Sequence, residues 1–344
     1  MLEIFRLSKA TMNTPHILPI HQRKYYKPLV LQMGVPEWMT PLLLFVIILI
    51  VTGPLTWFLN GPIVTSVNLA YMVAFSTYIV RSHQTSLRNL KPVLMLDEVD
   101  YEYWKYRLTH FRQSRMMSAT GLAIPAMLLV NWSHPEIQDL LKGDIPGFDF
   151  FWGLFLAILS WMVILQVIYI VISNTLMFAT LAKDHTRIDI FYIRDQLPYT
   201  KVGVANILLF AGAYTMIPIA YVDSGSLVLP ALLSLAVTLP MALTLFLLPL
   251  TAIRSRIHKE KADESQRITD AINGNRTALL DSYISDEAQT IPRSNMIVYR
   301  DLVERANEWP ITDNNMHRIG LYIIIPLLAW VGAALVERLV DSLF

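Results

Sequence analysis

The chain has 344 residues, of which 54% are hydrophobic and 16% charged, and its mean hydropathy is +0.44. Such a composition is typical of membrane proteins rather than of soluble globular domains. The 28 basic and 27 acidic side chains give a formal charge of +1, which excludes a broad basic surface for nucleic acid. The lack of cysteine excludes disulfides, thiolate metal sites and a cysteine nucleophile.

Six segments carry no charged residue and are long enough to cross a bilayer. They are 41–80, 116–135, 150–182, 202–222, 224–253 and 319–336. A helix needs about 20 residues to span hydrocarbon, so the first segment holds two helices, separated at the turn sequence Asn60-Gly61-Pro62. Continuous apolar runs favour helices over the alternating strands of a membrane barrel. The sequence therefore predicts an all-α, polytopic membrane protein with seven transmembrane helices.

The basic residues predict the orientation of these helices. The segments 1–40, 81–115, 183–201 and 254–318 together hold 26 of the 28 lysines and arginines. Because basic residues that flank a span remain in the cytoplasm, we expect a cytoplasmic N-terminus and, after seven helices, an outside C-terminus. The domains are then a cytoplasmic segment 1–40, helices 1 to 6 over 41–253 with cytoplasmic loops 81–115 and 183–201, a helical cytoplasmic stem 254–318, and helix 7 over 319–344.

The loop 81–115 has the pattern of an amphipathic helix. Asp97 is a plausible N-cap, and Tyr101, Trp104, Leu108 and Phe111 follow it at helical spacings. An acidic cluster lies in the same stretch: Asp97, Glu98, Asp100 and Glu102. A helix spreads these carboxylates around its axis, so capping and solvation are favoured over a metal site.

Polar residues within the spans are amides and hydroxyls, of which Asn68, Gln166, Asn174 and Asn206 are the candidate membrane polar sites. Hydrogen bonds between helices are the favoured interpretation, and a permeation pathway is the alternative. In the last span, Ala329 and Ala333 form a surface of small side chains that permits close packing of another helix. The spans contain no titratable acid, base or histidine, which disfavours proton-coupled transport.

The loop 183–201 carries a charged group that could form a ligand or gating network. Its members are Asp184, His185, Arg187 and Asp189. An interfacial loop held by ordinary ion pairs is the favoured alternative.

The stem 254–318 begins where the sixth span ends, and its helix is expected to continue past Arg254. Its apolar residues Ile268, Ile272, Leu279 and Tyr283 have spacings of 4, 7 and 4, as in an a/d seam. This seam either joins subunits or packs within one chain. A second amphipathic stretch presents Val298, Leu302 and Ala306 before Trp309-Pro310 turns the chain back toward the membrane.

No constellation for catalysis or cofactor binding is apparent. All eight histidines fall outside the spans, and none has the spacing of a haem, zinc or di-iron ligand set. Phosphate-binding loops and nucleophile elbows are also missing from the sequence. We therefore expect no enzyme activity, no cofactor and no bound metal.

Two features of the sequence indicate a resemblance to known proteins: two short cytoplasmic stretches and the predicted topology. The stretch Leu90-Lys91-Pro92-Val93-Leu94 that leads to Tyr103, and the loop from Asp184-His185 to Pro198, resemble segments of uncharacterised bacterial integral membrane proteins. This resemblance implies a bacterial inner membrane location and no particular activity. The predicted topology is similar to that of the insect odorant and gustatory receptor-like channels, which implies a tetrameric cation channel lined by the last helix. Their last-helix signature is not matched by Gly320 to Pro326.

The sequence favours an oligomeric channel-like or receptor-like membrane protein, with the lipid bilayer and further copies of the chain as partners and an unidentified ligand. A secondary transporter of a small molecule is one alternative. A non-enzymatic accessory or scaffold subunit of a membrane complex is the other.

Overall fold

The computed structural model describes residues 25–28, 42–43, 45–51, 63–130, 142, 147–215, 228–287, 290–311, 317, 320–321 and 324. Within these residues the chain is helical, apart from one short antiparallel pair between β1 (Tyr25–Tyr26) and β2 (Phe111–Arg112). The all-α prediction is confirmed for this part of the chain. Ala329, Ala333 and nearly all of the predicted helix 7 lie outside the described residues.

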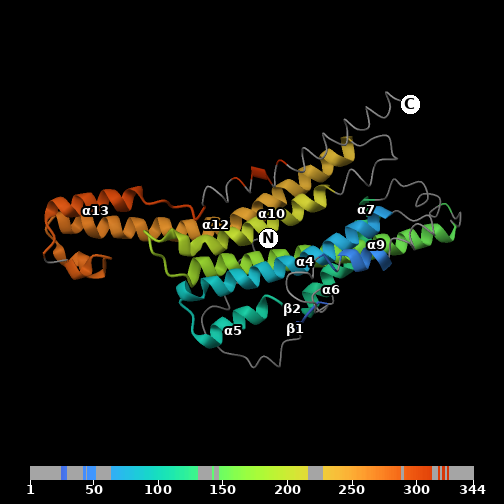
Figure 1. The fold of residues 1–344 in the computed structure, drawn as a ribbon, viewed down its shortest axis with the longest axis horizontal. Coiled ribbons are helices and arrows are strands. Elements are labelled where there is room, and N and C mark those ends of the chain that lie inside the picture. Colours follow the sequence, from blue (N-terminus) through green and yellow to red (C-terminus); the bar gives the residue numbers. More distant parts are fainter. Residues whose placement is uncertain are drawn as a thin grey trace.

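The helices and their order are drawn in Figure 1. They are α4 (Ile63–Leu90), α5 (Glu98–Arg107), α6 (Gln113–Gly121), α7 (Ala123–Val130), α9 (Phe148–Asp184), α10 (Leu197–Thr215), α12 (Val228–Ile272) and α13 (Arg293–Arg305). Short 3₁₀ helices connect some of them: η2 (Lys91–Val93), η3 (Ile193–Gln196), η4 (Arg276–Asp281) and η5 (Ser285–Glu287).

A bundle of α4, α9, α10 and α12 forms the centre of the molecule (Figure 1). Each of the four packs against at least two of the others, and α6 and α7 cover one side of α9. Between the four helices lies a core that includes Val73, Ile79, Val167, Leu209 and Leu245. Burial of this apolar surface holds the bundle together.

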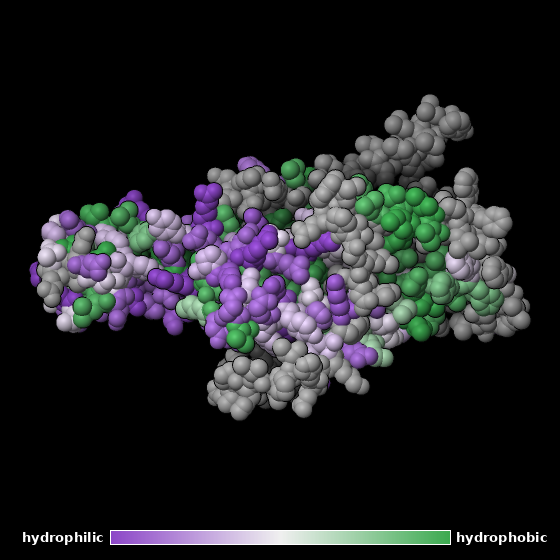
Figure 2. Space-filling model, turned by 60° about the horizontal axis from the view of Figure 1, so that its bottom comes forward, coloured by the Kyte–Doolittle hydropathy of each residue, from purple (hydrophilic) through white to green (hydrophobic). Residues whose placement is uncertain are grey.

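Two helical segments among the described residues are long and apolar enough to cross a membrane. They are Phe150–Asp184 and Ala236–Ile272, whose most apolar stretches have mean hydropathies of 2.6 and 2.0. Only 28% and 33% of these stretches are buried, whereas the core helix of a soluble protein is mostly buried. Figure 2 shows apolar surface toward the α7 end of the molecule and hydrophilic surface around the α13 end. Two candidate spans, rather than the seven predicted, are thus supported in the described part of the chain.

The third predicted span, 116–135, is not one continuous helix. α6 ends at Gly121 and α7 begins at Ala123, with Leu122 between them in a turn. Pro125 has no N–H to donate to the carbonyl of Gly121, and its ring crowds that carbonyl. The helical hydrogen bonds are therefore interrupted at Pro125, although Leu122 keeps helical backbone angles and accepts from the Ala126 N–H at 3.0 Å.

α12 continues without interruption from the apolar end of the bundle into the stem, as expected from the sequence. It spans 45 residues, or about 68 Å at the rise of an α-helix, and contains Pro240 and Pro249. α13 folds back along its polar end (Figure 1). The stem is therefore built on an extension of a bundle helix.

Candidate functional site

The polar end of the bundle encloses a histidine. α4 continues beyond Val80 as a helix to Leu90, and its buried stripe runs through Ile79, His83 and Leu87. His83 is completely buried on this stripe. His83 falls within the predicted loop 81–115, but the structure places it in α4 instead. The four-residue spacing of the buried stripe extends past the first charged residue, Arg81.

No hydrogen bond of regular geometry reaches the ring of His83. The Phe178 ring lies edge-on to it at a centroid distance of 5.6 Å. The Asn206 side chain and the Val202 backbone carbonyl lie beside the ring as weak hydrogen-bond partners, whose contacts with the ring nitrogens fall short of regular geometry. Burial lowers the pKa of His83 to about 4, and Asn206 and Val202 oppose this shift. The imidazole is therefore neutral near pH 7.

Asn206 joins three helices at the same level. Its amide nitrogen donates to the Thr175 hydroxyl of α9 at 2.8 Å and to the Leu245 carbonyl of α12 at 3.2 Å. Its Oδ1 atom is buried without a partner. His83, Thr175 and Asn206 thus form a buried polar site, here called the bundle site, in which the imidazole nitrogens and the amide oxygen make no hydrogen bond of regular geometry.

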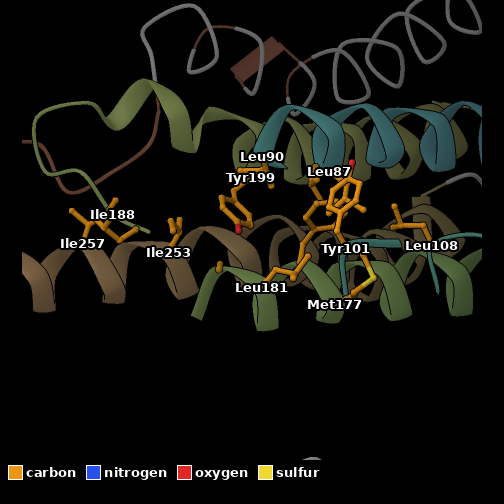
Figure 3. Packing of buried hydrophobic residues seen from close by; sticks show 13 residues of the cluster. Leu87, Leu90, Tyr101, Leu108, Met177, Leu181, Ile188, Tyr199, Ile253 and Ile257 are labelled. Carbon is orange, nitrogen blue, oxygen red and sulfur yellow. The ribbon is translucent and has the colours of Figure 1, made fainter. Parts of the chain in front are cut away.

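An apolar cluster closes the bundle site toward the polar end of the molecule. It contains Leu87, Leu90, Phe178, Leu181, Tyr199, Val202, Ile253 and Ile257, among others. Figure 3 shows these side chains gathered between the helices. The Tyr199 and Thr186 hydroxyls share a hydrogen bond of 2.5 Å, which fixes the loop after α9 over the cluster.

Three of the predicted amide sites make hydrogen bonds between elements. Gln166 donates to Thr120 at 2.9 Å and links α9 to α6, and Asn174 donates to the Leu108 carbonyl at 3.4 Å. Together with Asn206, they fit the favoured interpretation of interhelical hydrogen bonding. The Oδ1 atom of Asn68 is buried without a partner.

The predicted network of Asp184, His185, Arg187 and Asp189 is held by the backbone. The Met95 N–H donates to the His185 carbonyl, and the Arg187 N–H donates to the Val93 carbonyl, each at 2.8 Å. Asp189 accepts from the Phe191 N–H at 3.0 Å. No ion pair joins the four residues, all of which are described, so the loop is not held by the ion pairs of the favoured alternative. A role of these residues in ligand binding or gating stays a prediction.

The predicted seam of the stem is part of an intramolecular core. Ile268 and Leu279 are fully buried in a cluster with Met296 and Val303 of α13, and Ile272 packs against this cluster. Tyr283 is 44% exposed and donates to the Ile188 carbonyl. The seam is not one helix, because α12 ends at Ile272 and Gly274 follows with a φ of 113°, a left-handed conformation that favours glycine. Ile268 and Leu279 thus pack within one chain, as in the second of the two interpretations, and a contact of Tyr283 with another subunit stays a prediction.

Two of the apolar residues that the sequence presents on the second amphipathic stretch lie on the exposed face of α13. Val298 and Leu302 are 60% and 54% exposed, whereas Met296 and Val303 are buried against α12. Both faces of this short helix carry apolar residues, so spacing alone did not distinguish them.

A buried carboxylate that the sequence analysis missed holds the stem together. Glu264 is fully buried and accepts hydrogen bonds from the Ser282 hydroxyl, from the Tyr283 N–H at 3.3 Å and from the Tyr299 hydroxyl at 3.2 Å. Arg267 pairs with it at 3.2 Å. Burial, and then the Glu264 charge, raise the pKa of the Tyr299 hydroxyl. The arrangement links α12, the segment after η4 and α13.

A second carboxylate gathers an arginine, a lysine and a histidine where the chain returns to the bundle. Glu308 lies 3.1 Å from His258, 3.3 Å from Lys261 and 3.7 Å from Arg254. The hydrogen bond with His258 lowers the pKa of Glu308, and Lys261 lowers it further. The spacing of four and three residues along α12 was the signal that could have identified this cluster.

The acidic cluster of α5 forms a cap and ion pairs. Asp97 accepts from the Asp100 N–H at 2.7 Å, which confirms it as the N-cap. Glu98 pairs with Lys91 at 2.9 Å and Glu102 with Lys105 at 2.8 Å. Within the described ranges, no group of three histidine, aspartate or glutamate side chains could hold a metal ion.

Comparison of the chain with protein-family models, with curated proteins and with solved structures finds no match. The fold therefore defines the class as a helical protein with two candidate membrane-spanning helices in its described part.

Proposed function

We propose that the chain is a channel-like or receptor-like integral membrane protein that responds to a small polar ligand or ion at the bundle site. In this proposal it resides in the bacterial inner membrane with seven spans, a cytoplasmic N-terminus and an outside C-terminus. It acts without catalysis and without a resident cofactor.

The observation that carries the proposal is the unsatisfied polarity of the bundle site. Leaving buried donors and acceptors unpaired costs about 1 to 3 kcal/mol for each group, so their presence among four helices favours a binding role. The site lies where α4, α9, α10 and α12 meet, and a ligand that pairs with His83 and Asn206 would change how these helices pack.

Reconstitution tests this function. Purified protein in planar bilayers is expected to carry ionic current, and His83→Leu is expected to change its amplitude or open probability. His185→Leu is the control, because His185 is a half-buried histidine on the loop outside the bundle site. Solute flux without current would support the transporter instead, and the absence of both would contradict the proposal.

Assembly as a homo-oligomer is part of the proposal, and the outer face of α13 supports it. Ile297, Val298 and Leu302 are 51%, 60% and 54% exposed on this polar-end helix. Apolar side chains grouped on one face of a helix favour a protein contact. Chemical crosslinking in native membranes is expected to give oligomers that Leu302→Glu weakens. A stoichiometric foreign partner in place of a second copy would instead support the accessory-subunit alternative.

A further inference from the structure

A hollow on the surface of α12 lies at the boundary between the apolar and polar parts of this helix. It has a volume of about 320 Å³ and is lined by Thr251, Arg254, Ser255 and His258. These residues follow one another at spacings that place them on one helix face. Two hydroxyls, a guanidinium and an imidazole are all groups that donate hydrogen bonds to phosphate oxygens.

The charge around the hollow remains positive in spite of Glu308. One carboxylate faces both Arg254 and Lys261 as well as the His258 ring, so its single negative charge does not neutralise the two basic side chains. Arg254 stacks over the Trp309 ring at 4.6 Å, which holds its guanidinium in place. Its distance of 3.7 Å from Glu308 is long for a hydrogen bond, and its side chain is 47% exposed. An anion can therefore reach Arg254.

The same helix face continues into the apolar part of α12. Val237, Pro240, Thr244 and Leu247 are exposed and precede Thr251 at spacings of three and four residues. Arg254 is the first charged residue after the charge-free segment 224–253. A ligand with a phosphate in the hollow and an alkyl chain along this stripe would match both surfaces, whereas free phosphate would use only the first. The tryptophan beside the hollow is typical of the membrane interface.

We infer that Thr251, Arg254, Ser255 and His258 bind the phosphate of an anionic phospholipid in the cytoplasmic leaflet, with its acyl chain along the stripe from Val237 to Leu247. This inference rests on the membrane location proposed above. Basic residues next to a span attract anionic lipid in this way. The bound lipid headgroup would fill the hollow on the surface of α12.

The test uses the full chain in nanodiscs of phosphatidylcholine, with and without phosphatidylglycerol. Native mass spectrometry is expected to show phosphatidylglycerol retained by the natural protein in preference to phosphatidylcholine. Arg254→Gln is expected to weaken this retention about fivefold, the effect typical of one basic residue near the surface. Lys259→Gln removes the same charge from an exposed neighbouring position outside the hollow and is expected to change retention less than twofold.

Three results would overturn the inference. These are equal effects of Arg254→Gln and Lys259→Gln, no preference for phosphatidylglycerol, and full displacement of the lipid by inorganic phosphate. Arg254→Lys keeps the positive charge but removes the paired N–H donors of the guanidinium, and we expect this variant to retain part of the bound phosphatidylglycerol. Cell fractionation separates this inference from the proposed function. Membrane-bound protein without lipid preference refutes the inference alone, and protein absent from membranes refutes both.

Discussion

Removing the carboxylate of Glu264 should unfold the stem locally. Three donors converge on its Oε1 atom, and one of them, the Ser282 hydroxyl, belongs to a residue that is only 7% exposed. Glu264→Ala leaves these donors without an acceptor and Arg267 without its partner. Loss of one member of a buried charged network typically costs about 3 to 5 kcal/mol.

Glu264→Gln removes the negative charge of this side chain but keeps its shape. The amide oxygen can still accept from the Tyr299 hydroxyl, and Arg267 is 32% exposed, so water can replace part of its lost pairing. The expected cost is therefore smaller, about 1 to 3 kcal/mol. Glu304→Gln is the matched control, because Glu304 pairs with Arg300 on the same stem but is 55% exposed, and its loss should cost less than about 1 kcal/mol.

Hydrogen–deuterium exchange of stem peptides measures these differences directly. A loss of about 3 kcal/mol should accelerate exchange in α13 about a hundredfold in Glu264→Ala, while peptides from the bundle helices should change little. Equal exchange in Glu264→Gln and Glu304→Gln would refute the reasoning that burial makes Glu264 the organising residue of the stem.

Three further predictions concern the bundle and the end of α12. Because burial lowers the pKa of His83 to about 4, the unfolded chain binds more protons, and the free energy of unfolding should fall by about 3 kcal/mol as the pH drops from above 6.5 to about 4. Denaturation in detergent across this pH range should show the loss, and His83→Leu should remove that contribution. Gly203→Ala should destabilise the bundle by about 1 to 3 kcal/mol, because the added Cβ would lie 2.8 Å from the Phe246 carbonyl oxygen. Thermal unfolding measures this loss. Gly153→Ala is the control and should not destabilise the protein, because no atom lies within 4 Å of the added Cβ. Gly274→Ala should lower the free energy of unfolding by about 1 kcal/mol, because an alanine is strained at the left-handed φ of 113° that this glycine adopts. Hydrogen–deuterium exchange at the end of α12 should become faster, and unchanged exchange there would contradict this prediction.

Some features followed from the sequence because they depend on local patterns. Charge-free length predicted α9 closely, since 150–182 lies within Phe148–Asp184. The N-cap at Asp97 depends only on its own turn. The continuation of α12 past Arg254 also follows locally, because no helix-breaking residue occurs there.

Features that depend on contacts between residues distant in sequence could not be predicted from the sequence. Burial of Ile268 and Leu279 requires α13 to fold back onto α12, and no local pattern specifies this return. The bundle site likewise needs α4, α9 and α10 to meet at one level before His83 and Asn206 become neighbours. Residue type and spacing identify such groups, but only packing brings them together.

The unbroken course of α12 makes it a stiff arm shared by both ends of the molecule. Pro240 and Pro249 place its weakest backbone positions in the apolar part, and Ile253 and Ile257 hold the turns after Pro249 within the bundle. From Ile257 to Ile272 the free part of this arm measures about 22 Å, and a tilt of about 10° would sweep its tip through about 4 Å. Small angular changes where the bundle helices meet are thereby converted into large displacements of the α13 surface.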